Sequence, residues 1–256
     1  MKALVLSLIS CFALTLGYGK DEQTHRLPSF TPKPGSVVAV YVHRFKKDRW
    51  KEARATFQSR FYREIKNDTK DFRDSFILEN PEEAEILGVT IWRSKKDLDD
   101  WQQQPERAKH LKELDDYRSQ PFEAKRFDLL GMGSEVAIRR HHKPVLIPKP
   151  GTLVEVTTNF FDKARWKEAR DTFEREIVHQ ARKDEKDVRD SFFLERPQEG
   201  EVITVTVWRS AKALEEWTKN PASAKEAKQF DRFRSRPAEV KQFRVLDEIE
   251  ELVQHR

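Results

Sequence analysis

Two polar residues set in apolar strand segments are the first candidates for chemistry in this sequence. His43 lies near the end of a run of β-branched and apolar residues, and Asn159 lies in a second such run. A polar side chain buried on a strand needs a protein partner or a ligand. A histidine in that setting can act as a general base, because its surroundings readily move its pKa across neutral pH. Both residues are therefore candidate catalytic groups, with a hydrogen-bonded strand-end residue as the alternative.

Two tryptophans and one histidine on predicted helices extend the candidate set. Trp101 and Trp217 lie in aromatic stripes at helical spacing, which is typical of a core and also suits the wall of a ligand site. His110 is a surface histidine or, alternatively, a heme-binding residue. The adjacent His141 and His142 have poor chelating geometry, so we predict no metal site.

Composition excludes several classes of function. The only cysteine is Cys11, so disulfides, cysteine metal sites and thiol nucleophiles are not expected. There is no glycine-rich phosphate loop and no serine-hydrolase elbow. The net charge is +5, but basic and acidic residues alternate along the chain, so no nucleic-acid partner is predicted. Aromatic content of 11% argues against wholesale disorder.

The chain contains the same unit twice, at an offset of 116 residues. Residues 32–130 align with residues 148–246 without a gap, and 48 of these 99 pairs are identical. All six tryptophans fall into three matched pairs. A repeat of this length is a whole domain, because the units of solenoid proteins run to only about 20–50 residues.

Each repeat reads as β-α-β-β-α-β. In the first repeat, strands are predicted at residues 37–45, 73–78, 85–92 and 124–130. An amphipathic helix of about 18 residues, starting near Trp50, follows the first strand. Ser94 suits the N-cap of a second helix, and Pro105 suits the first turn of the next one.

This order of elements predicts an α+β fold, with an antiparallel four-stranded sheet and both helices on one face. The first strand is apolar on both faces, so the second face also needs a cover. We expect two ferredoxin-like βαββαβ repeats to pack sheet to sheet as an intramolecular dimeric α+β barrel. The chain would then be a pseudo-dimer and a monomer.

The predicted organisation has six segments. Residues 1–19 have the positive start, apolar stretch and small residues of a signal peptide, and residues 20–31 form an N-terminal segment. Repeat 1 spans residues 32–130, a linker spans 131–147, repeat 2 spans 148–247, and a tail spans 248–256. The expected location is secreted: extracellular, or periplasmic in a bacterium. Once the signal is cleaved, no membrane association is expected. Asn67 lies in a glycosylation sequon that a eukaryotic secretory pathway could use.

The segment Val207-Trp208-Arg209-Ser210, followed by a helix carrying Trp217, resembles the antibiotic biosynthesis monooxygenase (ABM) superfamily. The resemblance covers both repeats and implies the dimeric α+β barrel fold. The local likeness is to its heme-degrading monooxygenases. The resemblance implies a site with an Asn on the first strand, a Trp on the helix that follows the β-hairpin, and a heme-ligating His ten residues after that Trp.

Each repeat matches this implied site only in part. Asn159 and Trp217 match in the second repeat, whereas Trp101 matches in the first, with His43 at the Asn position. The ligand position holds Leu111 in one repeat and Ala227 in the other, and the nearby His110 is one residue early.

The predicted function is a secreted ABM-like protein that binds a small apolar or tetrapyrrole ligand. If the protein oxidises that ligand, we expect a monooxygenase reaction that requires no cofactor. Heme is an alternative ligand. His43, Asn159, Trp101 and Trp217 would position and hydrogen-bond the ligand. The alternative is a non-catalytic secreted or extracellular-matrix protein that uses the barrel as a stable scaffold.

Overall fold

A computed structural model describes residues 34–62, 72–134, 151–178 and 188–246. The predicted signal peptide, Asn67, His141 and His142 lie outside these ranges. None of the helices in the described part of the chain is long and apolar enough to cross a membrane.

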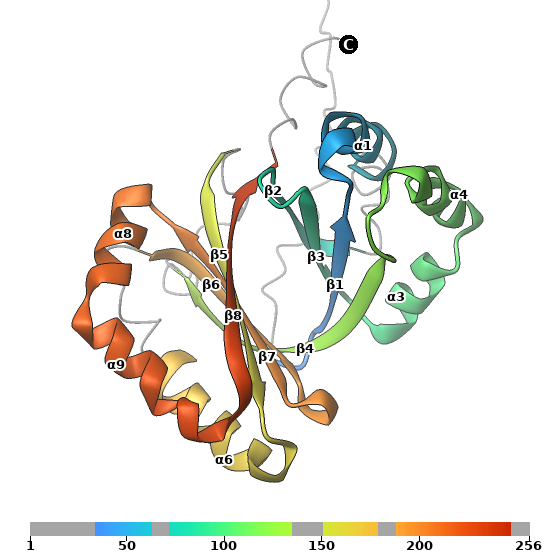
Figure 1. Cartoon of the computed structure of the whole chain (residues 1–256). Coiled ribbons are helices and arrows are strands. Elements are labelled where there is room, and N and C mark those ends of the chain that lie inside the picture. The colour runs from blue at the N-terminus through green and yellow to red at the C-terminus, as the bar shows by residue number, and fades with distance from the viewer. Residues whose placement is uncertain (1–33, 63–71, 135–150, 179–187, 247–256) are drawn as a thin grey trace, which may run out of the picture.

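The eight long strands form one closed antiparallel barrel (Figure 1). The first half contributes β1 (Val37–Arg44), β2 (Phe72–Asn80), β3 (Glu85–Trp92) and β4 (Glu123–Ser134). The second contributes β5 (Leu153–Phe161), β6 (Val188–Arg196), β7 (Glu201–Trp208) and β8 (Arg234–Val245). The order around the barrel is β1-β3-β2-β8-β5-β7-β6-β4. The predicted α+β class and the expected strands are confirmed.

The helices lie outside the barrel, each half carrying its own set (Figure 1). The first half has α1 (Trp50–Phe57), α3 (Lys95–Gln102) and α4 (Pro105–Glu113); the second has α6 (Trp166–Phe173), α8 (Ala211–Lys219) and α9 (Pro221–Gln229). Ser94 caps α3 by accepting from the backbone N–H of Asp97 at 3.1 Å, as predicted.

Short helical turns complete the set. They are η1 (Lys47–Arg49), η3 (Asp115–Tyr117), η4 (Lys163–Arg165), η6 (Pro197–Glu199) and η7 (Asp231–Phe233), together with the π-helical turns η2 (Gln58–Tyr62) and η5 (Glu174–Val178). Within the described residues, the helix predicted at about 18 residues is α1 followed by the π turn η2.

The start of the predicted linker is wrong. Gly131 to Ser134 belong to β4, where they pair with residues 190–193 of β6. Glycine and serine locally suggest a chain reversal. Here, pairing with the other half extends the strand instead. The opposite seam is shorter, because β2 pairs with β8 only through Leu78 with Val245 and Glu79 with Arg244.

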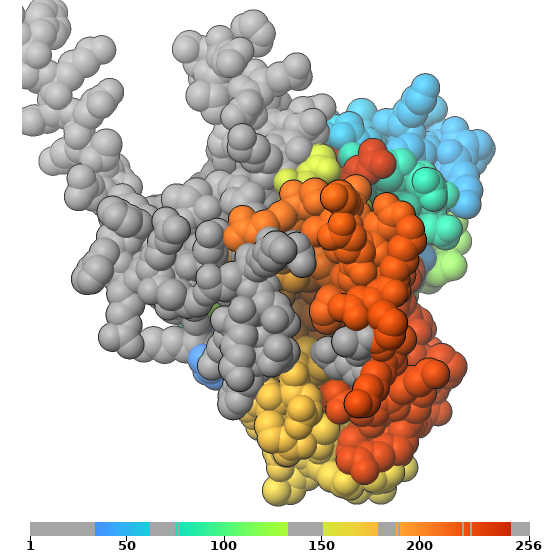
Figure 2. All heavy atoms as spheres, turned by 90° about the vertical axis from the view of Figure 1, so that its left-hand side faces the viewer, coloured from blue at the N-terminus to red at the C-terminus, as the bar shows by residue number. Residues whose placement is uncertain are grey.

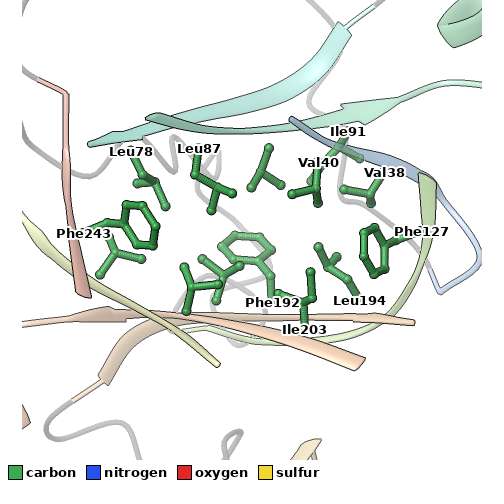
Figure 3. Packing of buried hydrophobic residues seen from close by; sticks show 14 of the residues in the cluster. Val38, Val40, Leu78, Leu87, Ile91, Phe127, Phe192, Leu194, Ile203 and Phe243 are labelled. Carbon is green, nitrogen blue, oxygen red and sulfur yellow. The ribbon is translucent and has the colours of Figure 1, made fainter. Parts of the chain in front are cut away.

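The barrel interior is the main hydrophobic core. Its side chains come from the strands of both halves and point toward one another (Figure 3). Separate clusters lie between the strands and the helices of each half. Leu246 joins the first-half cluster and Leu130 joins the second-half cluster, so each half helps to close the core of the other.

Candidate functional site

His43 lies on the helix side of β1, enclosed by aromatic rings. Phe57 and Phe122 contact it at centroid distances of 5.2 and 4.7 Å, and only 3% of the residue is exposed. Burial lowers the pKa of His43 well below its usual value, and the positive charges of Arg118 and Arg107 lower it further. The folded protein therefore holds this imidazole neutral, and its Nδ1 has no hydrogen-bond partner among the described residues.

Trp101 belongs to the same wall of the first half. Its ring lies 5.7 Å from Tyr41 and 5.1 Å from Trp92, and it is 2% exposed. The guanidinium of Arg107 covers it at 4.2 Å and is itself buried. Tyr41 also stacks on Phe122 at 5.9 Å. This packing fills the helix side of the first half with aromatic rings and one arginine.

His110, on α4, contacts Phe61, which also contacts His43. Its ring meets the Phe61 ring edge-on at 5.8 Å, and Phe61 in turn lies 5.9 Å from His43. Both histidines therefore belong to the same aromatic cluster around Phe61.

Asn159 occupies the equivalent position to His43 on β5, and the structure provides its partner. Arg234 donates two hydrogen bonds to Asn159 Oδ1, from Nε at 3.1 Å and from Nη2 at 2.8 Å. The same guanidinium binds Asp231 and the carbonyl of Ala227 on α9. The amide therefore ties β5 to the start of β8 and, through Arg234, to α9. His43 and Asn159 lie in different halves and do not share a site.

The second half lacks the side chains that fill the first. At the offset of 116, Tyr41 corresponds to Thr157, Phe122 to Ala238, Arg107 to Ser223, Phe61 to Ile177 and Leu111 to Ala227. Thr157, Ser223 and Ala238 are partly exposed, and Ala227 is exposed. Trp217 is half-buried, unlike Trp101, and its ring lies 6.1 Å from Trp208. Figure 2 shows this side of the molecule, where α8 and α9 form the orange surface.

Trp208 differs from its counterpart in hydrogen bonding. Trp92 donates from Nε1 to Thr90 at 2.8 Å. The Nε1 of Trp208 is buried and has no partner in the ranges that the structure describes. Leaving such a donor unpaired costs about 1–3 kcal/mol, so an acceptor from a ligand would be favoured there.

Glu155 is a candidate functional residue that the sequence analysis did not identify. It lies on the helix side of β5, with Thr157 and Asn159, where the first half has Ala39. Burial raises the pKa of its carboxyl group, which brings a carboxylate closer to the range of an effective general base. The available signal was the alignment of the two repeats, because an acidic residue replaces an apolar one on a half-buried strand.

The donor set does not suit a heme iron. The positions ten residues after the two tryptophans hold Leu111 and Ala227, neither of which can ligate a metal. His43 is packed among phenylalanines, and His110 packs on Phe61. The described residues contain no group of three or more His, Cys, Asp or Glu side chains that could hold a metal ion.

Comparison with known proteins gives a likeness of fold. No family model and no curated protein matches the sequence. An anthrone oxidase-like protein is similar in structure, with a TM-score of 0.66 and 13% identity over 85% of this chain and 94% of that protein. A candidate monooxygenase from Fusobacterium nucleatum has the same TM-score, with 9% identity over 84% of this chain and 94% of its own.

Other structural neighbours are of the same kind. A candidate monooxygenase from Lactobacillus acidophilus matches with a TM-score of 0.55 and 9% identity, over 82% and 93% of the two chains. A ferredoxin-fold protein of Listeria monocytogenes, described as related to antibiotic biosynthesis monooxygenases, matches at 0.48. At such low sequence identities the comparison shows a shared fold and does not show a shared function. The chain shares the fold of the Fusobacterium nucleatum and anthrone oxidase-like structures, which in this chain is an α+β fold around a closed eight-stranded antiparallel barrel.

Proposed function

We propose that this chain binds a small, largely aromatic molecule on the helix side of its second half. The observation that carries the proposal is the exchange between equivalent positions of the two halves. Tyr41, Arg107 and Phe122 pack together with Trp101 in the first half, whereas the second half has the smaller, partly exposed Thr157, Ser223 and Ala238 at the equivalent positions. A planar apolar ligand with polar edges suits a wall that combines a half-exposed tryptophan with threonine, serine and asparagine side chains.

The barrel itself is proposed to be the internal counterpart of a two-subunit barrel, with two ferredoxin-like repeats packed sheet to sheet. The matched strand order of the halves and the identity of 48 of 99 aligned residues support a tandem duplication. Two copies in one chain are free to diverge separately. Separate divergence accounts for the large side chains on the helix side of the first half and the smaller ones in the second. Because the two repeats pair with each other, the chain needs no second copy to complete the barrel.

Glu155 gives the second half a route to oxidation without a cofactor. A carboxylate can take the acidic C–H proton of a substrate such as anthrone, and the resulting carbanion reacts with O2. Conversion of anthrone to anthraquinone consumes one O2 and releases one water, so no other oxidant is needed. Asn159, fixed by Arg234, and Trp217 would orient the substrate. The anthrone oxidase-like structural neighbour supports this choice of substrate.

A direct test is anaerobic titration with anthrone, followed by O2 uptake in air. The wild-type protein is expected to bind anthrone saturably at one site. The variant S223R/A238F introduces the first-half residues into the second half and is expected to lose binding. The reverse exchange in the first half, R107S/F122A, is the matched control and is expected to retain it. Binding that survives S223R/A238F, in protein that is still folded, would contradict the proposal.

Hemin tests the tetrapyrrole alternative with a separate signal. A tetrapyrrole held by stacking alone gives a Soret band without the shift that accompanies histidine ligation. Because Leu111 and Ala227 stand at the ligand positions, replacing His43 or His110 is expected to leave that band unchanged. A band that is lost in either variant would show that an unexpected histidine ligates the iron.

A non-catalytic secreted scaffold is the second candidate. The filled first half favours it, since His43 and Trp101 are both packed as core. Secretion, extracellular or periplasmic, is itself part of the proposal and rests on the apolar stretch of residues 3–16. N-terminal sequencing of exported protein tests cleavage after Gly19. Absence of anthrone and hemin binding from an exported, folded protein would favour the scaffold.

A further inference from the structure

A cavity of about 260 Å³ opens at one end of the barrel. Its apolar wall is built from equivalent residues of the two halves: Val40 with Val156, Leu87 with Ile203, and Val89 with Val205. These side chains point into the barrel from opposite sides, as Figure 3 shows for Val40, Leu87 and Ile203. The cavity therefore lies where the two halves meet, apart from the helix-side surfaces described above.

Charged residues surround the mouth of this cavity, and the ion pairs cross between the halves. Lys241 of β8 binds Glu85 of β3 at 2.5 Å, and Lys125 of β4 binds Glu201 of β7 at 3.0 Å. Both glutamates are only 3% exposed. The two pairs occupy equivalent positions, so the mouth has an approximate two-fold arrangement of lysines above an apolar chamber.

Four basic and four acidic side chains line the cavity, and two of its carboxylates, Glu123 and Glu239, pair with Arg44 and Arg236. Glu85 is also 3.7 Å from Arg44, and Glu201 is 2.7 Å from Arg196, so each buried carboxylate has two basic partners. Each lysine, by contrast, forms one ion pair within the described part of the chain, and the charge of Glu123 acts on both lysines. An ammonium group carries three N–H donors. Two donors on each lysine therefore remain for an acceptor at the mouth.

We propose that the barrel cavity binds a medium-chain aliphatic carboxylate, with its chain among the valines and its carboxylate between Lys125 and Lys241. Charge-assisted hydrogen bonds from two lysines hold a carboxylate at the mouth, and the apolar wall removes the chain from water. At about 30 Å³ for each water-sized group, the volume holds roughly nine such groups. This size suits a chain such as that of octanoate.

This site is independent of the proposed aromatic site. It uses the inner face of the strands, whereas Thr157, Asn159 and Trp217 belong to the helix side. Loss of anthrone binding in S223R/A238F would leave octanoate binding intact. The aromatic-ligand site and the carboxylate site can therefore be refuted independently of each other.

Calorimetric titration of the purified protein tests the site with octanoate, octylammonium and acetate. Octanoate is expected to bind at one site, at least tenfold more tightly than either other probe, because octylammonium reverses the charge and acetate lacks the chain. V205F and V89F narrow the chamber from opposite halves and are expected to weaken octanoate binding by tenfold or more. V240F is the matched control, since Val240 lies on β8 but is 58% exposed; it is expected to bind as the wild type does.

A methyl NMR titration keeps the test decisive if the narrowed variants do not fold. Octanoate is expected to shift the methyl signals of Ile203, in the cavity wall, and to leave those of Ile86, in the helix-side cluster, unchanged. Absence of a saturable shift at Ile203 would overturn the proposal. So would octylammonium binding as tight as that of octanoate, or octanoate binding that persists in folded V205F and V89F.

Discussion

Replacing His43 by asparagine is expected to remove a loss of stability in mild acid. His43 is buried among Phe57, Phe61 and Phe122, and its folded-state pKa lies well below the usual value. The unfolded chain therefore binds a proton near pH 6.5 that the folded chain rejects. Stability therefore decreases as the pH is lowered, because the unfolded state binds more protons than the folded state. The contribution is fully present above pH 6.5 and is lost progressively below it.

The slope sets the size of this effect. One proton bound only by the unfolded state lowers the free energy of unfolding by at most about 1.4 kcal/mol per pH unit. Between pH 6.5 and pH 5.0 the wild-type protein therefore loses up to about 2 kcal/mol through His43.

The asparagine variant also supplies a missing acceptor. Arg118 Nε and Nη2 are buried with no hydrogen-bond partner among the described residues. In the second half, the equivalent Arg234 donates its Nε and Nη2 to Asn159. His43→Asn transfers that pairing to the first half. We expect it to offset part of the packing that is lost among the phenylalanine rings.

Urea unfolding of both proteins at pH 7.5, 6.5, 5.5 and 5.0 checks this account. The difference in unfolding free energy, variant minus wild type, is expected to grow by about 2 kcal/mol from pH 7.5 to 5.0. The other histidines and the carboxylates are common to both proteins, so their effects cancel in the difference. Curves that stay parallel over this range would refute the assignment of a neutral, buried His43.

Three further outcomes follow from the surroundings of individual residues. Trp101→Ala is expected to cost about 3–5 kcal/mol of stability in thermal or urea unfolding, and Trp217→Ala clearly less, because Trp217 is half-exposed; equal costs would contradict this difference in exposure. Gly200→Ala is expected to destabilise more than Gly151→Ala. Both glycines have positive φ, but only at Gly200 would the added Cβ lie 2.3 Å from a backbone oxygen. Glu155→Gln is expected to stabilise the protein at pH 7, where burial disfavours the charged carboxylate. This gain should shrink as pH falls through the raised folded-state pKa of Glu155 and the wild-type carboxyl group becomes neutral.

The fold was largely predictable because its determinants are local and occur twice. Runs of β-branched and apolar residues mark β1 and β3, Ser94 marks the start of α3, and Pro105 marks the start of α4. The extension of β4 through Gly131 was not predictable in this way. It depends on pairing with β6, and no local preference encodes the register between distant strands.

The candidate site was predictable only as a set of positions. Matching the repeats identified His43, Asn159, Trp101 and Trp217, but not their surroundings. Arg234 is 75 residues from the amide that it binds, and nothing in the spacing predicts that contact. The same is true of the ion pairs at the cavity mouth, because they form between halves.

The most direct test of the central claim is the anaerobic titration of anthrone into the wild-type protein and S223R/A238F. The account predicts saturable binding at one site in the wild type and its loss in the variant, with both proteins folded. Equal binding by the two proteins, or no saturable binding by the wild type, would contradict a ligand site on the helix side of the second half.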